Sequence, residues 1–559
     1  MIELKVIFME IKILKNGNLS KICNCKKEIS ALFLMKKEQL EFEYVVVAVK
    51  IDNIIFPLEH IIDSNCSVEF IHIGTREGLR IYQNSLIFVF MRAVHELFEK
   101  PKIQVKHSLG DGCYIETFSR FLLTQDDVVK IKKRMEHLIE EDEVFEPMYL
   151  SKRQAYKYFE DDEIKLQMLD YYPQKDILIY KYGELYDFFN GPLVPSSGYL
   201  KLFDLRYVPP GLILRFPTVD YPDKIGIFRP LTNLLKIFTE YERWGNILNL
   251  SYVSTLNKKV ENFEINEIIQ VSEALHEKKI AEIAEDIHQK RNSGIVVLIS
   301  GPSASGKTTF VKRLAIQLKV IGLSSFVTSL DNYFLDREVT PKDMQGEYDF
   351  ESINALDKDL INQHVEQLLS GKEIEIPKYN FRAGRREDHG TKFQTSKDQI
   401  IILEGIHGLN DILTPSIKRK NKYKIYVSAL TQLNLDNLNR ISTSDTRIIR
   451  RIVRDTFFRG YDAEQTIKRW DSIRAGERKF VFSFQEEADV MFNSALVYEL
   501  GVLKRIAIPE LMKITQESEQ FSEAQRLIKL LSFFVTIPEI NIPRNSILRE
   551  FIKGSDFDY

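Results

Sequence analysis

The most informative pattern along the chain is a short apolar run that leads into a glycine-rich loop. Residues 295–300 (IVVLIS) have the apolar character of a buried parallel strand. Residues 310–318 carry apolar side chains at helical spacing. Between them lies Gly301-x-x-x-x-Gly306-Lys307-Thr308, so the sequence predicts a strand, a tight loop and a helix in succession.

Three more apolar runs predict further strands of the same sheet. Residues 324–330 end at Asp331, residues 400–403 end at Glu404, and residues 423–427 form the last run. In an open α/β sheet the carboxyl ends of the strands form the ligand crevice. We therefore expect both carboxylates to face the glycine-rich loop.

The first half of the chain predicts smaller mixed elements. Residues 44–51 and 67–73 have strand character, and residues 78–98 have helical spacing. A second helix should begin near Leu123, with Thr124 as its N-cap, and run to Leu138. Turn-forming residues 191–198 precede a strand-like stretch at 199–203.

Two further segments are predicted to be helical. Residues 255–291 carry one apolar stripe and indicate a helical connector. Residues 511–534 predict a helical appendage that becomes irregular through Pro538 and Pro543, and we assign it no chemistry.

Length and composition change this picture little. A chain of 559 residues is too long for one core, so three or four domains are expected. The net charge of −3 gives no basis for a nucleic-acid partner bound by overall charge. Apolar segments are too short to span a membrane, the N-terminus lacks a signal-peptide pattern, and four cysteines show no metal or disulfide spacing. We expect a cytoplasmic protein.

The glycine-rich loop has the composition of a phosphate cradle. Its glycines let the backbone approach phosphate oxygens, and its N–H groups and the following helix N-terminus favour an anion. Lys307 would reach the β- and γ-phosphates of ATP and take part in catalysis, and the Thr308 hydroxyl would bind Mg²⁺. The residues expected to bind ATP are Gly301, Ser303, Ala304, Ser305, Gly306, Lys307, Thr308 and Thr309.

The two strand-end carboxylates suit phosphoryl transfer. Asp331 could accept the proton of an attacking hydroxyl, although a turn aspartate is common at such a position. Glu404 fits a Mg²⁺ site, which needs one or two carboxylates beside phosphates.

Further along, arginines recur three or four residues apart. Arg447, Arg450, Arg451 and Arg454 fall on one helical face, which could close over a phosphate as a lid or could remain a solvated basic face.

Residues 294 to about 500 resemble the uridine kinase/phosphoribulokinase family. The motifs that carry the resemblance, in the family's order, are Gly301-Pro-Ser-Ala-Ser-Gly-Lys-Thr, Leu330-Asp-Asn-Tyr-Phe, Tyr348-Asp-Phe-Glu with Ala355-Leu-Asp, Pro377-Lys-Tyr-Asn-Phe, Leu403-Glu-Gly-Ile, and Arg450-Arg-Ile-Val-Arg-Asp-x-x-x-Arg-Gly460.

The resemblance implies a set of site residues. Asp331 would activate a ribose 5′-hydroxyl, Asp349 would bind the ribose hydroxyls, and Glu404 with Thr308 would hold Mg²⁺. The remaining residues expected at the substrate are Tyr333, Tyr379, Phe381, Arg451, Arg454 and Arg459.

One stretch departs from the family's pattern. Family uridine–cytidine kinases place a histidine shortly after the Tyr-x-Phe motif to recognise the pyrimidine, whereas Gly384 stands near that position here. The neighbouring Arg382, Arg385 and Arg386 could instead meet an anionic substrate.

Roughly the first 250 residues resemble the N-terminal half of threonyl-tRNA synthetase, a TGS domain followed by an editing domain. The resemblance is carried by Arg76-Glu-Gly-Leu, Leu123-Thr-Gln-Asp-Asp-Val with Lys133-Arg-Met, and Asp187-Phe-Phe-Asn-Gly-Pro-Leu193. The family's metal-binding His-x-x-x-His and Cys-x-x-x-His positions read Asn84, Phe88, Phe189 and Leu193. Such side chains neither coordinate a metal nor move a proton, so editing chemistry is expected to be absent.

The sequence therefore predicts a multidomain α/β protein with a P-loop-type parallel sheet and flanking helices. The expected divisions are a β-grasp-like TGS unit at 1–75, an α+β editing-like domain at 76–250, a helical linker at 251–292, a kinase-like domain at 293–504 and a helical appendage at 505–559.

Three functions remain open. The first is a kinase that uses ATP and Mg²⁺ to phosphorylate the 5′-hydroxyl of a nucleoside, with uridine or cytidine as the leading acceptors. The second phosphorylates an acidic or phosphorylated metabolite. The third is an RNA-linked regulatory NTPase whose synthetase-like half contacts RNA. A homo-oligomer is compatible with each of them.

Overall fold

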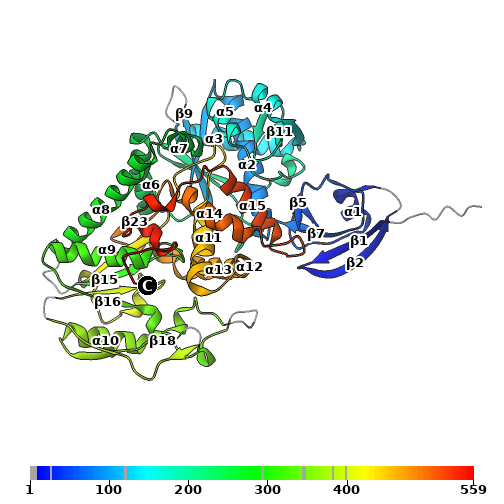
Figure 1. The fold of residues 1–559 in the computed structure, drawn as a ribbon. Coiled ribbons are helices and arrows are strands. Elements are labelled where there is room, and N and C mark those ends of the chain that lie inside the picture. The colour runs from blue at the N-terminus through cyan, green and yellow to red at the C-terminus, as the bar shows by residue number, and fades with distance from the viewer. Residues whose placement is uncertain are drawn as a thin grey trace, which may run out of the picture.

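A computed structural model describes residues 9–25, 28–118, 123–290, 295–342, 346, 348–380, 383–396 and 399–558. Figure 1 shows the first sheet standing out to one side of the molecule, while the last helices lie at its centre. The kinase-like sheet occupies the lower left of that view. No helix among these residues is long and apolar enough to cross a membrane.

The chain begins with a small mixed sheet. Its strands lie in the order β2-β1-β7-β4-β5, in which β1 and β7 are parallel and the other neighbours are antiparallel. The elements are β1 (Met9–Lys15), β2 (Asn18–Cys25), β3 (Ile29–Ser30), α1 (Ala31–Lys37), β4 (Val46–Ile51), β5 (Ile54–Phe56), β6 (Ile61–Ile62) and β7 (Cys66–His72). The strands predicted at 44–51 and 67–73 are β4 and β7.

The second region is an α+β unit with two antiparallel sheets, β13-β14-β9-β8 and β10-β11-β12. Its elements are α2 (Arg76–Leu97), β8 (Lys102–Ser108), β9 (Gly112–Phe118), α3 (Gln125–Glu140), β10 (Glu146–Ser151), α4 (Lys152–Tyr158), α5 (Glu163–Asp170), β11 (Asp176–Tyr182), β12 (Leu185–Phe188), β13 (Asp204–Val208) and β14 (Gly211–Arg215). Both predicted helices are present, and Thr124 caps α3 in a capping box with Asp127.

The strand predicted at 199–203 is wrong. Residues 197–199 form a 3-10 turn, and the next strand begins only at Asp204. The Tyr82 hydroxyl accepts a hydrogen bond from Leu202 N (2.8 Å) and lies 3.1 Å from its carbonyl oxygen. A side chain thus satisfies the backbone groups that a neighbouring strand would otherwise pair with.

Three helices lead into the kinase-like region: α6 (Thr232–Ile247), α7 (Val253–Glu261) and α8 (Ile265–Lys290). The predicted helical connector is therefore α7 and α8. It is not a free linker, because Arg313 of helix α9 (Lys307–Val320) forms ion pairs with Glu273 and Glu277 of α8.

The kinase-like region is built on a five-stranded parallel sheet in the order β16-β21-β15-β22-β23. Its strands are β15 (Val296–Ser300), β16 (Ser325–Ser329), β21 (Ile400–Glu404), β22 (Lys422–Ser428) and β23 (Val490–Asn493). The sequence predicted the first four. The fifth, β23, is only four residues long and was missed.

The remaining elements surround this sheet. Between β16 and β21 lie α10 (Lys358–Leu369) and the short strands β17 (Glu373–Ile376), β18 (Tyr379–Asn380), β19 (Arg385–Arg386) and β20 (Thr391–Gln394). After β22 come α11 (Thr443–Arg454), a π-helical turn at Asp455–Arg459, α12 (Ala463–Lys468) and α13 (Trp470–Phe480). The chain ends with α14 (Glu499–Leu511), α15 (Phe521–Ser532) and 3-10 turns at Glu539–Asn541 and Ile547–Glu550.

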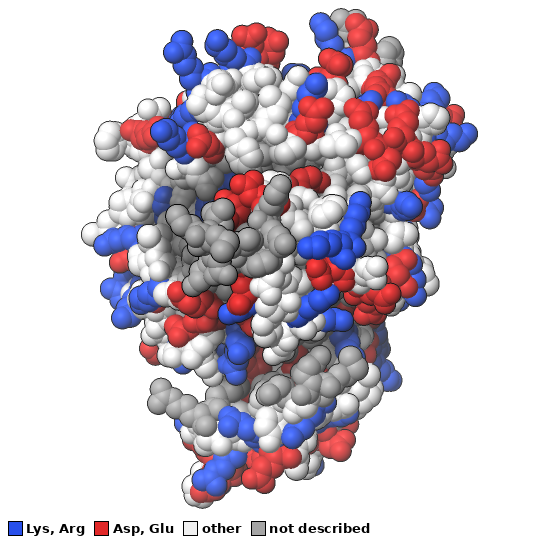
Figure 2. All heavy atoms as spheres, turned by 90° about the vertical axis from the view of Figure 1, so that its right-hand side faces the viewer, with Lys and Arg blue, Asp and Glu red and all other residues white. Residues whose placement is uncertain are grey.

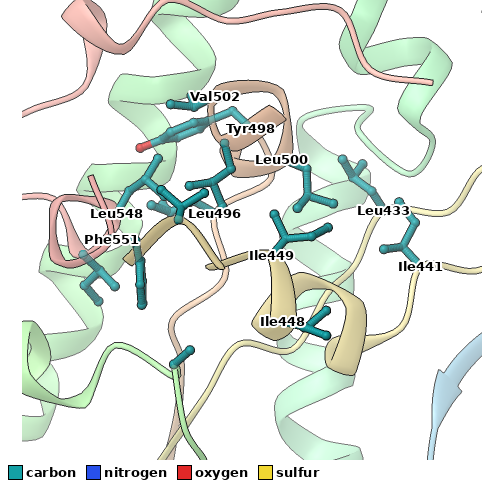
Figure 3. Packing of buried hydrophobic residues seen from close by; sticks show 14 of the residues in the cluster. Leu433, Ile441, Ile448, Ile449, Leu496, Tyr498, Leu500, Val502, Leu548 and Phe551 are labelled. Carbon is teal, nitrogen blue, oxygen red and sulfur yellow. The ribbon is translucent and has the colours of Figure 1, made fainter. Parts of the chain in front are cut away.

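One hydrophobic core runs through several of the predicted divisions. A single cluster of buried residues includes Phe188 of the second region, Ile283 of α8, Phe310 of α9 and Phe551 near the C-terminus. Figure 3 shows the C-terminal Leu548 and Phe551 packed beside Leu496 and Tyr498. The C-terminal segment is therefore an integral part of the core of the kinase-like region.

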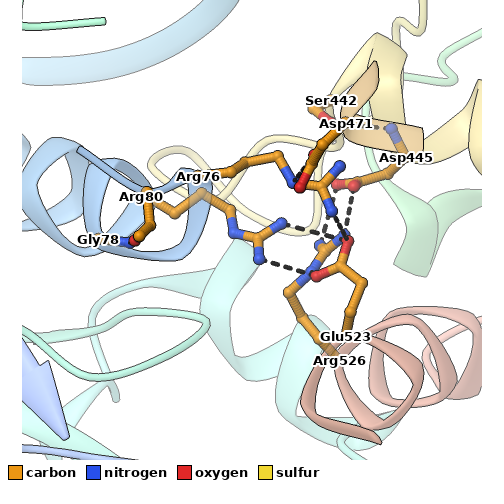
Figure 4. Close-up of polar contacts among 9 residues, drawn as sticks. Arg76, Gly78, Arg80, Ser442, Asp445, Asp471, Glu523 and Arg526 are labelled. Carbon is orange, nitrogen blue, oxygen red and sulfur yellow. Dashed lines mark hydrogen bonds and ion pairs between the residues drawn. The ribbon is translucent and has the colours of Figure 1, made fainter. Parts of the chain in front are cut away.

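A charged cluster joins four helices (Figure 4). Glu523 of α15 pairs with Arg76 and Arg80 of α2, while Arg526 of α15 pairs with Asp445 of α11. Arg76 also lies 3.4 Å from Asp471 of α13. The cluster fixes α11, whose arginines reach the phosphate loop, against the synthetase-like part of the chain.

Candidate active site

The loop after β15 has the backbone strain expected of a phosphate cradle. Gly306 caps α9 with φ of 82°, and Ala304 also has a positive φ of 57°. A Cβ at Gly301 would lie 2.0 Å from the Val427 carbonyl oxygen, so only glycine fits against β22. The loop therefore turns tightly between the sheet and the first turn of α9, as the sequence predicted.

Two buried arginines of α11 donate hydrogen bonds to backbone carbonyls of this loop. Arg447 Nε donates to the Ser303 carbonyl (2.9 Å), and Arg450 Nη1 donates to the Ala304 carbonyl (3.4 Å). Both side chains are fully buried and form ion pairs, Arg447 with Glu477 and Arg450 with Glu499. These two arginines therefore shape the loop and do not belong to an exposed lid face.

Lys307 lies at the centre of a group of carboxylates. Its Nζ donates to the carbonyl oxygens of Gly301 (2.8 Å) and Pro302 (3.1 Å). Burial lowers the pKa of Lys307, and the nearby carboxylates of Glu404 and Asp331 oppose that shift. Lys307 is thus within electrostatic reach of both strand-end carboxylates.

The sheet register explains why Glu404 and Asp331 meet. Glu404 is the last residue of β21 and pairs with Ile299 of β15 on one side and Ser329 of β16 on the other. Asp331 follows β16 by two residues, and its N–H is capped by the Ser329 hydroxyl (3.3 Å). Burial raises the pKa of Glu404 to about 7, and the Asp331 charge adds to that rise. Burial also raises the pKa of Asp331, while Lys307 and Arg459 lower it.

A third carboxylate, which the sequence analysis left without a role, belongs to this group. Burial raises the pKa of Glu351 to about 7, with the charges of Glu477 and Asp331 in the same direction and those of Arg451 and Lys307 against it. Gly476 of α13 packs directly on the Glu351 side chain. Glu351 stands two residues after Asp349 in the same motif, and this position was the signal in the sequence that could have identified it.

Asp349 itself is placed differently. Its N–H donates to the Pro341 carbonyl (2.7 Å), and its carbonyl accepts from Ser352 N (3.2 Å). The pKa of Glu351 responds to the charges of both Lys307 and Asp331. Glu351 therefore lies within electrostatic reach of Lys307 and Asp331, and the role of Asp349 at the ribose hydroxyls stays a prediction.

Three arginines converge on one buried carboxylate at the end of α11. Arg451, Arg454 and Arg459 lie 3.2, 2.8 and 3.9 Å from the carboxylate oxygens of Asp455. Arg451 Nη1 also donates to the Ser303 hydroxyl (2.5 Å). Burial lowers the pKa of Arg451 to about 10, and the charge of Arg454 lowers the pKa of Arg459. Three guanidinium groups gathered beside the loop suit an anion such as a phosphate.

The aromatic residues expected at the substrate are packed within the protein. The Tyr333 hydroxyl is 3.1 Å from His364 Nδ1, and the Tyr379 ring packs on Phe334 at 5.5 Å between ring centroids. Tyr333 and Tyr379 are both buried. They belong to the hydrophobic core next to the site. Phe381 lies outside the described residues.

The stretch that replaces the family's histidine is a tight turn. Gly384 has φ of 69°, and a Cβ there would lie 2.7 Å from the Arg337 guanidinium. Arg386 donates to the carbonyls of Phe334 and Tyr333 and pairs with Asp357. Arg386 is therefore engaged within the protein, Arg385 is exposed, and Arg382 lies outside the described residues.

The donor set suits a hard cation. Thr308 is the second residue of α9, Glu404 is the last residue of β21, and Asp331 is close enough to raise the pKa of Glu404. Oxygen donors of this kind fit Mg²⁺. Across the described ranges no cluster of three or more His, Cys, Asp or Glu side chains forms a metal site. A Mg²⁺ ion here would take only one or two protein ligands and complete its shell with phosphate and water.

The positions of the degenerate editing motif also come together. Phe88 of α2 and Phe189 after β12 have ring centroids 5.1 Å apart, and Phe88 also contacts Phe145 and Tyr182. Phe88, Phe189 and Leu193 are all buried. The region that the resemblance associates with editing is filled by a hydrophobic core.

This fold and this loop define a P-loop kinase domain in the C-terminal half of the chain. Residues 296–499 match the model of the Phosphoribulokinase / Uridine kinase family. The N-terminal region matches threonine–tRNA ligases.

Two of these ligases illustrate the N-terminal match. The one from Prochlorococcus marinus (strain MIT 9515) is 30% identical over 183 residues, which are 32% of this chain and 29% of the ligase. The one from Fusobacterium nucleatum is 31% identical over 166 residues, 29% of this chain and 27% of the ligase. The chain thus spans less than a third of the length of the curated relatives it matches.

Among solved structures, one described as a possible uridine kinase from Bacillus stearothermophilus aligns with part of this chain. It is 16% identical and aligns with a TM-score of 0.27, covering 39% of this chain and 98% of that structure.

Proposed function

We propose that the protein is a kinase that transfers the γ-phosphoryl group of ATP to the 5′-hydroxyl of a nucleoside, with uridine and cytidine as the first acceptors to test. The observation that carries the proposal is the meeting of Lys307 with the carboxylates of Asp331 and Glu404 at the carboxyl ends of adjacent parallel strands. A nucleotide-binding switch needs no second carboxylate opposite its phosphate loop, whereas an acceptor hydroxyl needs a proton acceptor.

Each group has a role that follows from its surroundings. Asp331 would take the proton of the attacking hydroxyl, since burial raises its pKa and so strengthens it as a base. Lys307 and the loop N–H groups would hold the phosphates of ATP, and Arg451, Arg454 and Arg459 would face the transferring group. Catalysis would then consist of alignment and charge stabilisation.

Mg²⁺ would be held by Thr308 and Glu404. When bound there it would supply positive charge to the phosphate oxygens. The raised pKa of Glu404 is consistent with this role, because a buried carboxylate beside a second one favours a cation between them.

The family match supports phosphotransfer but not the identity of the acceptor. We infer that the acceptor meets Glu351 as well as Asp331, since the charge of Lys307 acts on the pKa of both carboxyls. Two acidic groups favour a neutral polyhydroxyl acceptor over an acidic one. The engagement of Arg386 by Asp357 removes much of the basis for an anionic acceptor.

The test is an ADP-release assay with purified full-length protein, ATP, Mg²⁺ and a panel of acceptors. The panel contains uridine, cytidine, adenosine, guanosine and a sugar phosphate. We expect turnover with a nucleoside that is lost in Asp331→Asn and kept in the control Asp359→Asn, whose exposed carboxyl lies in the first turn of α10. Turnover with the sugar phosphate alone, or equal activity of Asp331→Asn, would contradict the proposal.

For the N-terminal half we propose a supporting role. Arg76 and Arg80 reach Glu523 beside α11, and buried Lys165 pairs with Asp436 in the segment that leads into α11. On the face drawn in Figure 2, acidic and basic side chains are mixed, and acidic ones gather at the upper right. That face offers no continuous basic surface among its described residues. RNA contact remains a prediction, which a filter-binding assay with transfer RNA would test.

A further inference from the structure

The C-terminal segment, expected to carry no chemistry, touches the phosphate loop directly. The turn at Ile547–Glu550 packs on helix α9. A Cβ placed on Gly306 would lie 2.6 Å from Ile547 Cγ2, and Ile547 is fully buried. This turn lies outside residues 296–499, so the family pattern does not include it.

The turn delivers a carboxylate to the first turn of α9. Glu550 Oε2 accepts hydrogen bonds from Thr309 N (3.0 Å) and from the Thr309 hydroxyl (2.9 Å). Thr309 is the third residue of α9, and its N–H is one of the helix N-terminal donors available to a phosphate oxygen. Glu550 therefore occupies donors that the proposed triphosphate would use.

The charge of Glu550 affects the pKa of several residues around the phosphate loop. It opposes the lowering of the pKa of Lys307 and of Arg459, and it adds to the rise of the pKa of Glu404. All three residues belong to the phosphate and metal side of the proposed site. Glu550 is thus a carboxylate inside the phosphate-binding region.

The backbone that carries Glu550 is firmly anchored. Leu548, Phe551 and Ile552 are fully buried, and the Arg450 guanidinium lies 4.9 Å from the centre of the Phe551 ring. The Arg549 guanidinium donates to the carbonyls of Glu539, Ile542 and Lys553. The segment cannot leave without opening the core, so only the partly exposed Glu550 side chain is free to turn.

We propose that Glu550 is a built-in competitor of the nucleotide, an autoinhibitory latch that must release Thr309 before a phosphate oxygen can take the same donors. The inference rests on the proposed binding of a triphosphate at this loop. A single N–H cannot serve a carboxylate and a phosphate in full, and the two anions repel each other at such close range. The latch lowers nucleotide affinity and speeds the departure of ADP.

The test is nucleotide binding without any acceptor, so that it does not depend on the identity of the substrate. Isothermal titration with a non-hydrolysable ATP analogue and Mg²⁺ is performed on the full-length protein and on Glu550→Ala, Glu550→Gln and Lys307→Ala. The matched control is Glu539→Gln, which removes an exposed carboxylate from the same C-terminal segment.

We expect Glu550→Ala to bind about tenfold more tightly, equivalent to about 1.4 kcal/mol. Glu550→Gln should show a smaller gain, because its amide oxygen still accepts from Thr309 while the charge is gone. Glu539→Gln should bind as the unaltered protein does. Equal or weaker binding by both Glu550 variants would overturn the latch, since weaker binding means that Glu550 helps to hold the nucleotide.

Failure of the proposed function gives a different result. If the unaltered protein binds no nucleotide and Lys307→Ala changes nothing, both proposals fall. If the unaltered protein binds and Lys307→Ala does not, while the Glu550 variants match the unaltered protein, the latch alone is overturned. Melting temperatures of the variants show whether each is folded, and Glu550→Gln preserves the shape of the side chain if alanine does not permit folding.

Discussion

Replacing Gly476 with alanine tests whether the placement of Glu351 matters for catalysis. Gly476 lies within α13, and a Cβ there would be 2.4 Å from Glu351 Cβ and 2.7 Å from its Cγ. Ordinary contact begins near 3.4 Å, so Glu351 must move by about 1 Å. A displacement of about 1 Å at a reacting group costs on the order of 10²-fold in rate.

Stability should change much less than activity. Alanine is favoured over glycine in a helix interior by about 1 kcal/mol, which offsets part of the strain from the new contact. We therefore expect Gly476→Ala to melt within a few degrees of the unaltered protein. Its kcat/KM for the acceptor should fall by about 10²-fold, while its affinity for the ATP analogue stays within about twofold.

The assay is ADP release at varied acceptor concentration, with the melting temperature measured in parallel. The control is Gly245→Ala in α6, where the new Cβ would meet nothing closer than the Leu250 carbonyl oxygen at 3.5 Å. If Gly476→Ala keeps the acceptor kcat/KM while remaining folded, the placement of Glu351 beside Asp331 has no part in the reaction.

A double variant tests whether the effect of Gly476→Ala is transmitted through Glu351. Because Gly476→Ala acts through Glu351, adding it to Glu351→Gly, which also removes the Cβ that the new methyl group would meet, should cause little further loss. Additive losses would show that Gly476 acts through some other group.

Four further results are expected. Asp331→Asn should abolish turnover and leave binding of the ATP analogue nearly intact, whereas Lys307→Ala should weaken both, as kinetics and titration would show. The pKa of the Glu404 carboxyl rises by burial from 4.5 to about 7, so its ionisation lowers the stability of the fold as pH rises from 4.5 past 7. Glu404→Gln should therefore raise the melting temperature at pH 8 more than at pH 5, and an equal change at both values would refute this assignment. Arg526→Met should destabilise the fold by roughly 3 kcal/mol in chemical denaturation, because it leaves Asp445 without its partner.

The sequence predicted the parts of the site whose chemistry is local. The phosphate loop, the strand before it and the two strand-end carboxylates follow from short apolar runs and fixed spacing, and the structure brings Lys307, Asp331 and Glu404 together. The N-cap at Thr124 was equally local and was confirmed. The family match bears out the resemblance of residues 294 to about 500.

What the sequence could not supply depends on long-range packing. In the sequence Arg447 and Arg450 cannot be told apart from Arg451 and Arg454, and only the packing of α11 on the loop shows the first two to be fully buried. Glu351 and Glu550 stand far from the loop in sequence, and no spacing rule links them to it. The prediction of a strand at 199–203 was wrong for the same reason, since the hydroxyl of Tyr82, more than a hundred residues away in sequence, bonds to the backbone of Leu202.

The continuous core has a consequence for how this chain can be dissected. Phe310 and Leu314 of α9 lie in one cluster with Ile283 of α8 and Leu548 near the C-terminus. Both of those partners fall outside the boundaries of the kinase family pattern. In a fragment cut at those boundaries, apolar side chains would be exposed on α9, the helix that begins at the phosphate loop. The kinase-like region and the segments on either side of it therefore depend on one another to complete a single core.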